Sequence, residues 1–211
     1  MVTSNDWHSI SKYRNKETIP HEENLDKQLV NTSALQHFVK SSVAQFRLHH
    51  DGSKVPFLIF QKLKTSYNVL KQIDVEAYPA SSRSYQKYVL YNHIEDGLPP
   101  FSFTLIVFAP NQKTPKHSHR VDCAPICLKG LVKETLYREA DESHKGTSPK
   151  LEVIRTQIYK PYEGAYLLKC EPNIHHLENA SHNSISMSLH LYLFDACCPK
   201  GKSSSILKVY R

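Results

Sequence analysis

The sequence predicts a mainly β protein, in which a small antiparallel β-barrel or jelly roll follows a helical N-terminal cap. Two observations carry this prediction. Before Pro79, apolar residues recur every three or four positions, as on one face of a helix. After Pro79, eight or nine short segments rich in β-branched and aromatic residues are separated by Pro, Gly, Asn and Asp. We expect a loosely ordered segment at 1–23 and one domain over 24–211, with the cap at 24–78 and the barrel at 79–211.

The composition fits one globular domain without a nucleic-acid-binding or membrane-spanning part. The chain has 211 residues, of which 40% are hydrophobic, and a formal net charge of +7. Its lysines are scattered, and it carries no signature of a nucleic-acid-binding fold. No apolar run approaches the roughly 18–20 residues that cross a bilayer, and the polar N-terminus lacks a secretory core. We therefore expect no nucleic-acid partner and no membrane contact, and a monomer is compatible with the sequence.

The cysteines indicate a reducing environment. There are five, an odd number, and their spacing is irregular: Cys123 and Cys127 are separated by three residues, and Cys197 and Cys198 are adjacent. No CxxC pair is present, so a zinc ribbon is not expected. Reduced thiols in a cytoplasmic protein are the prediction that follows.

Two amphipathic helices are predicted in the cap. The first begins near Asn24 and is interrupted by Asp51-Gly52-Ser53; its apolar face is Leu25, Leu29, Leu35, Phe38, Val39, Val43 and Phe46. The second follows Pro56, a residue that suits the first turn of a helix, and its apolar residues run from Leu58 to Ile73. We expect both helices to pack on the barrel without contributing catalytic residues.

The predicted strands cover most of the chain after Pro79. They are Tyr85–Tyr91, Phe101–Phe108, Ala124–Leu128, Leu131–Tyr137, Leu151–Tyr159, Ala165–Leu168, Ile174–Glu178, Ile185–Leu193 and Ile206–Tyr210. The polar segment 138–150 contains Gly146 and Pro149 and is predicted to be an exposed hairpin loop. Small barrels of this kind bind ligands in their mouths.

Two histidines one residue apart, His117 and His119, close the strand predicted at Phe101–Phe108. Alternate side chains of a strand share a face, so both imidazoles can bind one metal ion. Neutral imidazole is a common ligand for Fe, Zn, Cu and Ni. The pair on its own is weak evidence, because two exposed strand histidines give the same pattern. The prediction of a metal site therefore depends on the residues around the pair.

Further polar residues lie near the C-terminus. His175 and His176 are adjacent on one predicted strand, and either ring could point inward. On the next strand, Ser188, His190 and Tyr192 share one face, opposite Met187, Leu189 and Leu191. This row faces either the interior, where each group needs a hydrogen-bond partner, or solvent at an edge strand. Alternation leaves both possibilities open.

Several of these stretches together resemble the cysteine dioxygenases. Residues 110–119 (PNQKTPKHSH) are similar to the first cupin motif, and 130–137 (GLVKETLY) continue it as in that family. Residues 175–179 (HHLEN), 188–192 (SLHLY) and 194–197 (FDAC) resemble the second half of the family's site, whereas 85–91 and 112–117 look more like the bacterial thiol dioxygenases. The resemblance covers roughly residues 80–198 and implies a cupin fold.

The resemblance also implies roles for individual residues. His117, His119 and His175 would bind one Fe(II) per chain. Ser188, His190 and Tyr192 would orient substrate and oxygen, and Tyr85 would line the substrate pocket.

The residues support a three-histidine site independently. Many iron oxygenases use two histidines and one carboxylate, but the glutamate that general cupins place shortly after the histidine pair is missing here. Asp122 lies one or two residues short of that position. Three neutral ligands leave the full charge on Fe(II), which a substrate thiolate then lowers, and dioxygen uptake by sulfur gives a sulfinic acid.

Three positions depart from the family pattern. Lys87 stands where the cysteine enzymes have an arginine for the substrate carboxylate, and it offers a point charge without the bidentate fork. Animal enzymes of the family carry a cysteine that crosslinks to the tyrosine at the place of Tyr192, and Cys123 falls near the place of that cysteine. The segment from His119 to Gly130 is one residue shorter here, which can turn a side chain to the other face, so a crosslink is left open. His176 replaces an arginine, and we expect a surface histidine.

The function expected from the sequence is a thiol dioxygenase that converts L-cysteine to cysteine sulfinate with O2. One alternative is the same reaction on 3-mercaptopropionate, cysteamine or another small thiol. The other is a metal-binding cupin without dioxygenase activity, which the lysine at position 87 keeps open.

Overall fold

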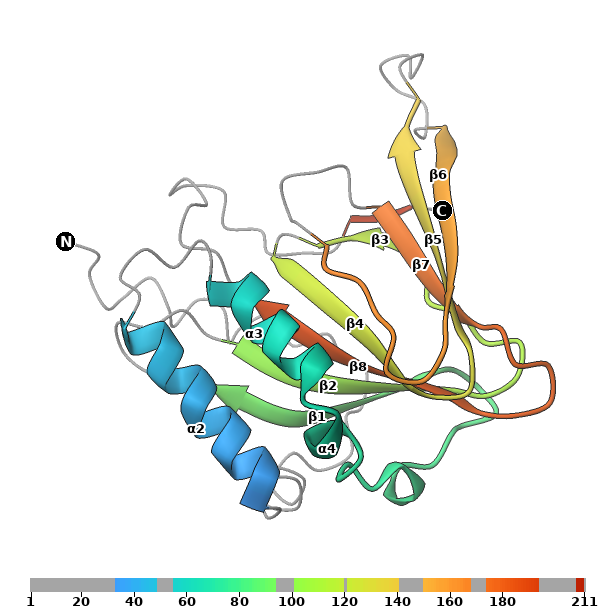
Figure 1. The fold of residues 1–211 in the computed structure, drawn as a ribbon. Coiled ribbons are helices and arrows are strands. Elements are labelled where there is room, and N and C mark those ends of the chain that lie inside the picture. Colours follow the sequence, from blue (N-terminus) through green and yellow to red (C-terminus); the bar gives the residue numbers. More distant parts are fainter. Residues whose placement is uncertain are drawn as a thin grey trace, which may run out of the picture.

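The strands form two antiparallel sheets that face each other, and helices cover the outer face of one of them (Figure 1). The computed structural model describes residues 33–48, 55–93, 101–119, 121–140, 150–167, 174–193 and 208–210. The predicted loose segment 1–23, the helix start at 24–32 and the FDAC stretch at 194–197 lie outside these residues. None of the helices described is long and apolar enough to cross a membrane.

The first sheet contains four strands in the order β1-β2-β8-β4, namely β1 (Gln86–His93), β2 (Phe101–Phe108), β8 (Ser186–Leu193) and β4 (Asp122–Lys129). Its central strand β2 is almost entirely buried because both of its faces are covered. Phe103, Leu105 and Val107 face the helices, whereas Ile106 and Phe108 face the second sheet.

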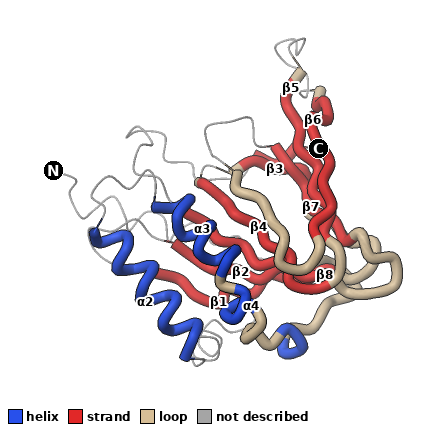
Figure 2. Tube along the Cα trace, in the orientation of Figure 1, coloured by secondary structure: helices blue, strands red, loops and turns tan. Residues whose placement is uncertain are grey.

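The second sheet contains five strands in the order β6-β5-β7-β3-β9. They are β6 (Leu151–Tyr159), β5 (Val132–Glu139), β7 (Ile174–Asn179), β3 (Lys116–Ser118) and β9 (Lys208–Tyr210). In Figures 1 and 2, β5 and β6 form a long hairpin that extends beyond the rest of the sheet. The segment 138–150 was expected to be a loop, but β5 and β6 pair as far as Glu139 and Leu151.

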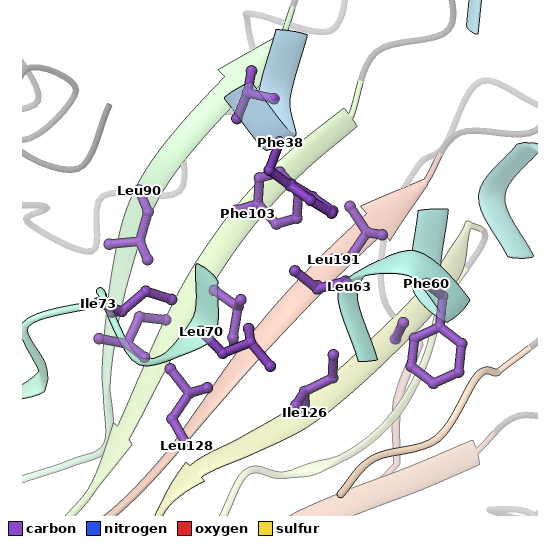
Figure 3. Close-up of a cluster of buried hydrophobic side chains, with 14 of the residues drawn as sticks. Phe38, Phe60, Leu63, Leu70, Ile73, Leu90, Phe103, Ile126, Leu128 and Leu191 are labelled. Atoms are coloured by element: carbon purple, nitrogen blue, oxygen red, sulfur yellow. The ribbon is translucent and has the colours of Figure 1, made fainter. Parts of the chain in front are cut away.

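The helices pack on the first sheet through one apolar core. They are α2 (Ser33–Leu48), α3 (Val55–Thr65) and the single turn α4 (Tyr67–Leu70), followed by a 3-10 turn at Val75–Ala77. Figure 3 shows Phe38 beside Phe103, with Leu63 of α3 and Leu191 of β8 in the same cluster. The second predicted helix is divided at Ser66, and Ile73 lies beyond the last helical turn, yet it remains in the core.

Two predictions about strands were wrong. The histidine pair does not close β2, because a turn at Ala109–Gln112 with Asn111 at φ 66° redirects the chain into the second sheet. Residues 165–168 were expected to form a strand, but 164–167 run beside β4 through isolated bridges at Gly164 and Leu167. Pro125 faces this segment and has no N–H to donate, which interrupts the ladder.

Candidate metal centre

The short strand β3 brings the histidine pair to β7. His117 lies directly opposite His175 in the antiparallel pair β3–β7. The segment before β3 is fixed to the same strand, since Thr114 N donates to Leu177 O and Leu177 N donates to Thr114 Oγ1. His119 follows the end of β3 with its ring against the other two. Residues distant in sequence thus meet through pairing of a three-residue strand.

The three rings present their Nε2 atoms to one another. His119 Nε2 lies 3.0 Å from His117 Nε2 and 3.1 Å from His175 Nε2. Three nitrogens that each lie about 2.1 Å from one ion, roughly at right angles, are about 3 Å apart. Among the described residues, this is the group of histidine, cysteine or carboxylate side chains with the spacing of a metal site. The arrangement therefore fits a mononuclear metal ion.

The opposite nitrogens of two rings have partners that fix the tautomer. His117 Nδ1 donates to Pro115 O at 2.8 Å, and His175 Nδ1 donates to Glu134 Oε1 at 2.8 Å. A carbonyl or a carboxylate only accepts, so the proton of each ring resides on Nδ1. The Nε2 lone pairs are consequently directed at the common point.

Burial keeps two of the rings neutral. It lowers the pKa of His117 to about 4 and that of His119 to about 2, and the neighbouring His175 lowers both further. Neutral imidazole is the form that binds metal. These two rings are therefore neutral throughout the physiological pH range, each with a proton on only one nitrogen.

Within the described part of the chain, no carboxylate oxygen lies beside the three Nε2 atoms at the spacing of a fourth ligand. Asp122, the acid nearest to the expected position, is buried and accepts a 2.5 Å hydrogen bond from Tyr166 Oη. Tyr166 packs on Phe57 and Phe60, so Asp122 connects β4 to α3. The candidate centre therefore consists of three histidines, a cluster compatible with a metal site.

The row Ser188, His190 and Tyr192 lies inside the molecule, which decides between the two alternatives left by the sequence. Its strand β8 is central, between β2 and β4, and Ser188 and His190 are at most 1% exposed. Ser188 Oγ lies 2.9 Å from His190 Nε2, and Tyr192 Oη lies 3.5 Å from His190 Nδ1. The Tyr192 ring packs against His119 with 5.3 Å between centroids, so the row reaches the three histidines.

Cys123 lies opposite Tyr192 in the pair β4–β8. Its Sγ is 3.7 Å from His190 Nδ1, on the same face as the row. The shorter segment after His119 therefore does not turn this cysteine away. Burial raises the pKa of Cys123 and of Tyr192 well above their usual ranges, so both groups keep their protons at neutral pH.

A pocket adjoins the centre and contains both candidate substrate-binding residues. Its lining consists of Tyr85, Lys87, Ile106, Thr114, Pro115, His117, Leu177, His190 and Tyr192. Lys87 is exposed at the start of β1, and its Nζ lies 5.7 Å from the centroid of the Tyr85 ring. His176 points to the other face of β7, where its Nδ1 lies 2.9 Å from Tyr137 Oη.

Sequence reasoning did not find Glu134. This carboxylate is 1% exposed and accepts hydrogen bonds from His175 and, at 2.7 Å, from Tyr159 Oη. A signal was present, because alternation along β5 places position 134 on the same inward face as the buried Val132. A charged residue at an inward position of a strand indicates a buried polar partner.

A comparison with protein families shows to which family the chain belongs. A sequence model of "Cysteine dioxygenase type I" matches residues 59–199, about two thirds of the chain. The chain belongs to this family. No curated protein sequence matches it.

Among solved structures, this cysteine dioxygenase family member is similar to cupins at low identity. A cupin superfamily protein from Desulfitobacterium hafniense is 14% identical over 57% of this chain and 86% of that chain, with TM-score 0.41. A cupin 2 domain-containing protein from Halorhodospira halophila is 12% identical over 56% and 69%, with TM-score 0.40. The two antiparallel sheets form a cupin fold, and the family is one of thiol dioxygenases.

Proposed function

We propose that this protein is a non-haem Fe(II) dioxygenase that adds both atoms of O2 to the sulfur of L-cysteine and releases cysteine sulfinate. The observation that carries the proposal is the convergence of three imidazole Nε2 atoms without a carboxylate, in a member of the cysteine dioxygenase type I family. His117, His119 and His175 would hold one ferrous ion per chain. When bound, that ion would favour the thiolate form of a substrate thiol and would supply the redox chemistry that dioxygen requires.

The protein contributes orientation around this centre. Lys87 stands at the pocket beside Tyr85 and offers a positive charge for a substrate carboxylate. Tyr192 keeps its proton, because burial raises its pKa, and its hydroxyl can donate to oxygen at the reacting sulfur. His190 holds that hydroxyl in place, and Ser188 in turn fixes His190. Removal of the Tyr192 hydroxyl by Tyr192→Phe should slow turnover and leave the iron content unchanged.

The choice of thiol rests on Lys87. Cysteine and 3-mercaptopropionate carry a carboxylate that a lysine can pair with, whereas cysteamine carries none. We expect Lys87→Ala to raise KM for the first two thiols and to leave turnover of cysteamine unchanged. Equal effects on all three would show that Lys87 does not recognise a carboxylate.

The deciding experiment is oxygen uptake by protein loaded anaerobically with Fe(II). Cysteine, 3-mercaptopropionate and cysteamine are added separately, and the sulfinate products are identified by mass spectrometry. We expect the highest kcat/KM for L-cysteine. If iron is bound and no thiol stimulates oxygen uptake, the alternative of a metal-binding cupin without dioxygenase activity is correct.

We also propose that Cys123 and Tyr192 form a thioether crosslink. Support comes from their opposite positions on β4 and β8 and from the shared contact with His190 Nδ1. Bond formation removes one hydrogen from each side chain, with O2 as the oxidant. Peptide mass spectrometry should detect the joined peptides after turnover, and Cys123→Ser should abolish them. Separate, unmodified peptides after many turnovers would contradict this proposal.

A cytoplasmic location is proposed as well. Cys123 and Cys127, the two cysteines within the described residues, are free and buried thiols. Such thiols persist in a reducing compartment. Retention of the native chain in the cytosolic fraction would test this.

A further inference from the structure

Glu134 is a buried carboxylate with two donors. It lies on β5, between β6 and β7. Its Oε1 accepts a hydrogen bond from His175 Nδ1, and its Oε2 accepts one from Tyr159 Oη. Arg155 Nη2 lies 3.9 Å from Oε2, although the arginine side chain is half exposed. The carboxylate is thus fixed by three neighbours, one of which is a candidate metal ligand.

The surroundings of Glu134 are those of an apolar core. Val132 and Tyr159, next to it on the inward face, belong to the cluster between the two sheets, together with Leu177 of β7. A carboxylate at such a position loses its hydration, and that cost is met only by strong hydrogen bonds. An apolar side chain would fill the same space without the cost. The carboxylate therefore has a role that packing does not supply.

We propose that Glu134 is a positioning residue for the metal centre. It holds the proton of His175 on Nδ1, aims the Nε2 lone pair at the metal, and makes that imidazole the most electron-rich of the three ligands. It also places a negative charge one ring away from a centre whose ligands are all neutral. General cupins have a glutamate that binds the metal directly. Here Glu134 would supply the negative charge indirectly, through its hydrogen bond to His175.

The proposal rests on the metal site of the proposed function but does not depend on the reaction that the site catalyses. Metal affinity is therefore the quantity to measure. Glu134→Gln keeps the shape and an acceptor for His175 but removes the charge. The matched control is Glu178→Gln, which removes a charge from the opposite face of β7, where the carboxylate pairs with Lys133. Affinities for Fe(II) and Co(II) are measured by chelator competition, and metal-free thermal unfolding is followed in parallel.

We expect Glu134→Gln to weaken metal binding about 10- to 100-fold, the usual effect of losing such an outer partner. Glu178→Gln should change the metal affinity less than about 2-fold, because Glu178 pairs with Lys133 and His176 and not with a proposed ligand. The visible spectrum of the Co(II) form should shift in Glu134→Gln only, because only that change alters ligand strength. A purely structural residue would instead lower the unfolding temperature of the metal-free protein without changing affinity or spectrum in the folded state.

A second measurement uses the unaltered chain, so it does not depend on whether the variant folds. Nitrogen-15 NMR of histidine side chains in the metal-free and Zn(II)-loaded protein reports which ring nitrogen carries the proton. We expect His175 to carry it on Nδ1 in both states, coupled to a strongly hydrogen-bonded resonance. A proton on Nε2 in the metal-free protein, or zinc on Nδ1, overturns the proposal.

The outcomes are distinguishable from failure of the proposed function. Equal metal affinity in the wild type and Glu134→Gln overturns the role of Glu134 even if the enzyme is active. Weaker binding in Glu134→Gln alone supports it even if no thiol is oxidised. A wild-type chain that binds neither Fe(II) nor Co(II) overturns both.

Discussion

At the scale of the residue, the hydrogen bond made by one ring nitrogen of a histidine decides whether the other nitrogen can bind a metal. His117 donates to a backbone carbonyl and His175 to a carboxylate, so both rings keep Nε2 free for a metal. His176 is adjacent to His175, yet alternation along β7 turns it to Tyr137 and Glu178 on the opposite face. Two neighbouring histidines thus have different chemistry because a strand has two faces.

This difference gives a direct test of the ligand set. His117→Ala and His175→Ala should each abolish iron retention, because two imidazoles hold a ferrous ion too weakly to survive desalting. His176→Ala should retain the wild-type iron content. Metal per chain is measured by elemental analysis after anaerobic loading and gel filtration. Full iron content in either of the first two variants would refute the ligand set.

The buried thiols give a prediction about pH. Burial raises the pKa of Cys127 to about 12, above the ordinary thiol value of 9.0. Between these values an unfolded chain releases the thiol proton and the folded chain keeps it, so the free energy of unfolding falls as pH rises from about 9. Cys127→Ala should reduce that slope in urea titrations at several pH values. If Cys127→Ala leaves the slope unchanged, the thiol has the same pKa in the folded and the unfolded chain.

At the scale of the element, β3 positions the histidine pair, and it is a strand that the sequence did not predict. A strand of three residues shows no periodicity, and its partners β7 and β9 follow far later in the chain. The longer strands gave clear patterns: Phe101–Phe108 and Leu151–Tyr159 were predicted with their observed bounds. The identity of the site residues came from motif resemblance, whereas their convergence came from pairing that local patterns do not encode.

The segment beside β4 depends on one close backbone approach. A Cβ on Gly164 would lie 2.2 Å from Pro125 O and 2.9 Å from Ile126 Cα. We expect Gly164→Ala to push the segment from β4 and to destabilise the protein by about 1–3 kcal/mol, as overpacking does. Lys160→Ala, an exposed position in the same connection, should change stability by less than about 0.5 kcal/mol. Equal stabilities in urea unfolding would mean that the segment can move without cost.

At the scale of the whole molecule, the first sheet separates structural from chemical residues. Along β8, Met187, Leu189 and Leu191 face the helical core, whereas Ser188, His190 and Tyr192 face the candidate site. The helices contribute apolar side chains to the same core as β1, β2 and β4. We infer that cap and barrel unfold as one unit, in line with the single domain predicted from the sequence.

Paired substitutions in α3 test this inference. Leu63 is 1% exposed in the core, and Leu58, on the same helix, is 46% exposed. Leu63→Ala should lower the free energy of unfolding by about 2–5 kcal/mol because it leaves a cavity, and Leu58→Ala by less than about 0.5 kcal/mol. Helical circular dichroism and the absorption of a Co(II)-loaded centre should then be lost at one temperature in each variant. Loss of the helical signal in Leu63→Ala while the metal absorption persists would show that the cap melts alone, because a core shared by helices and sheet cannot lose one side and keep the other intact.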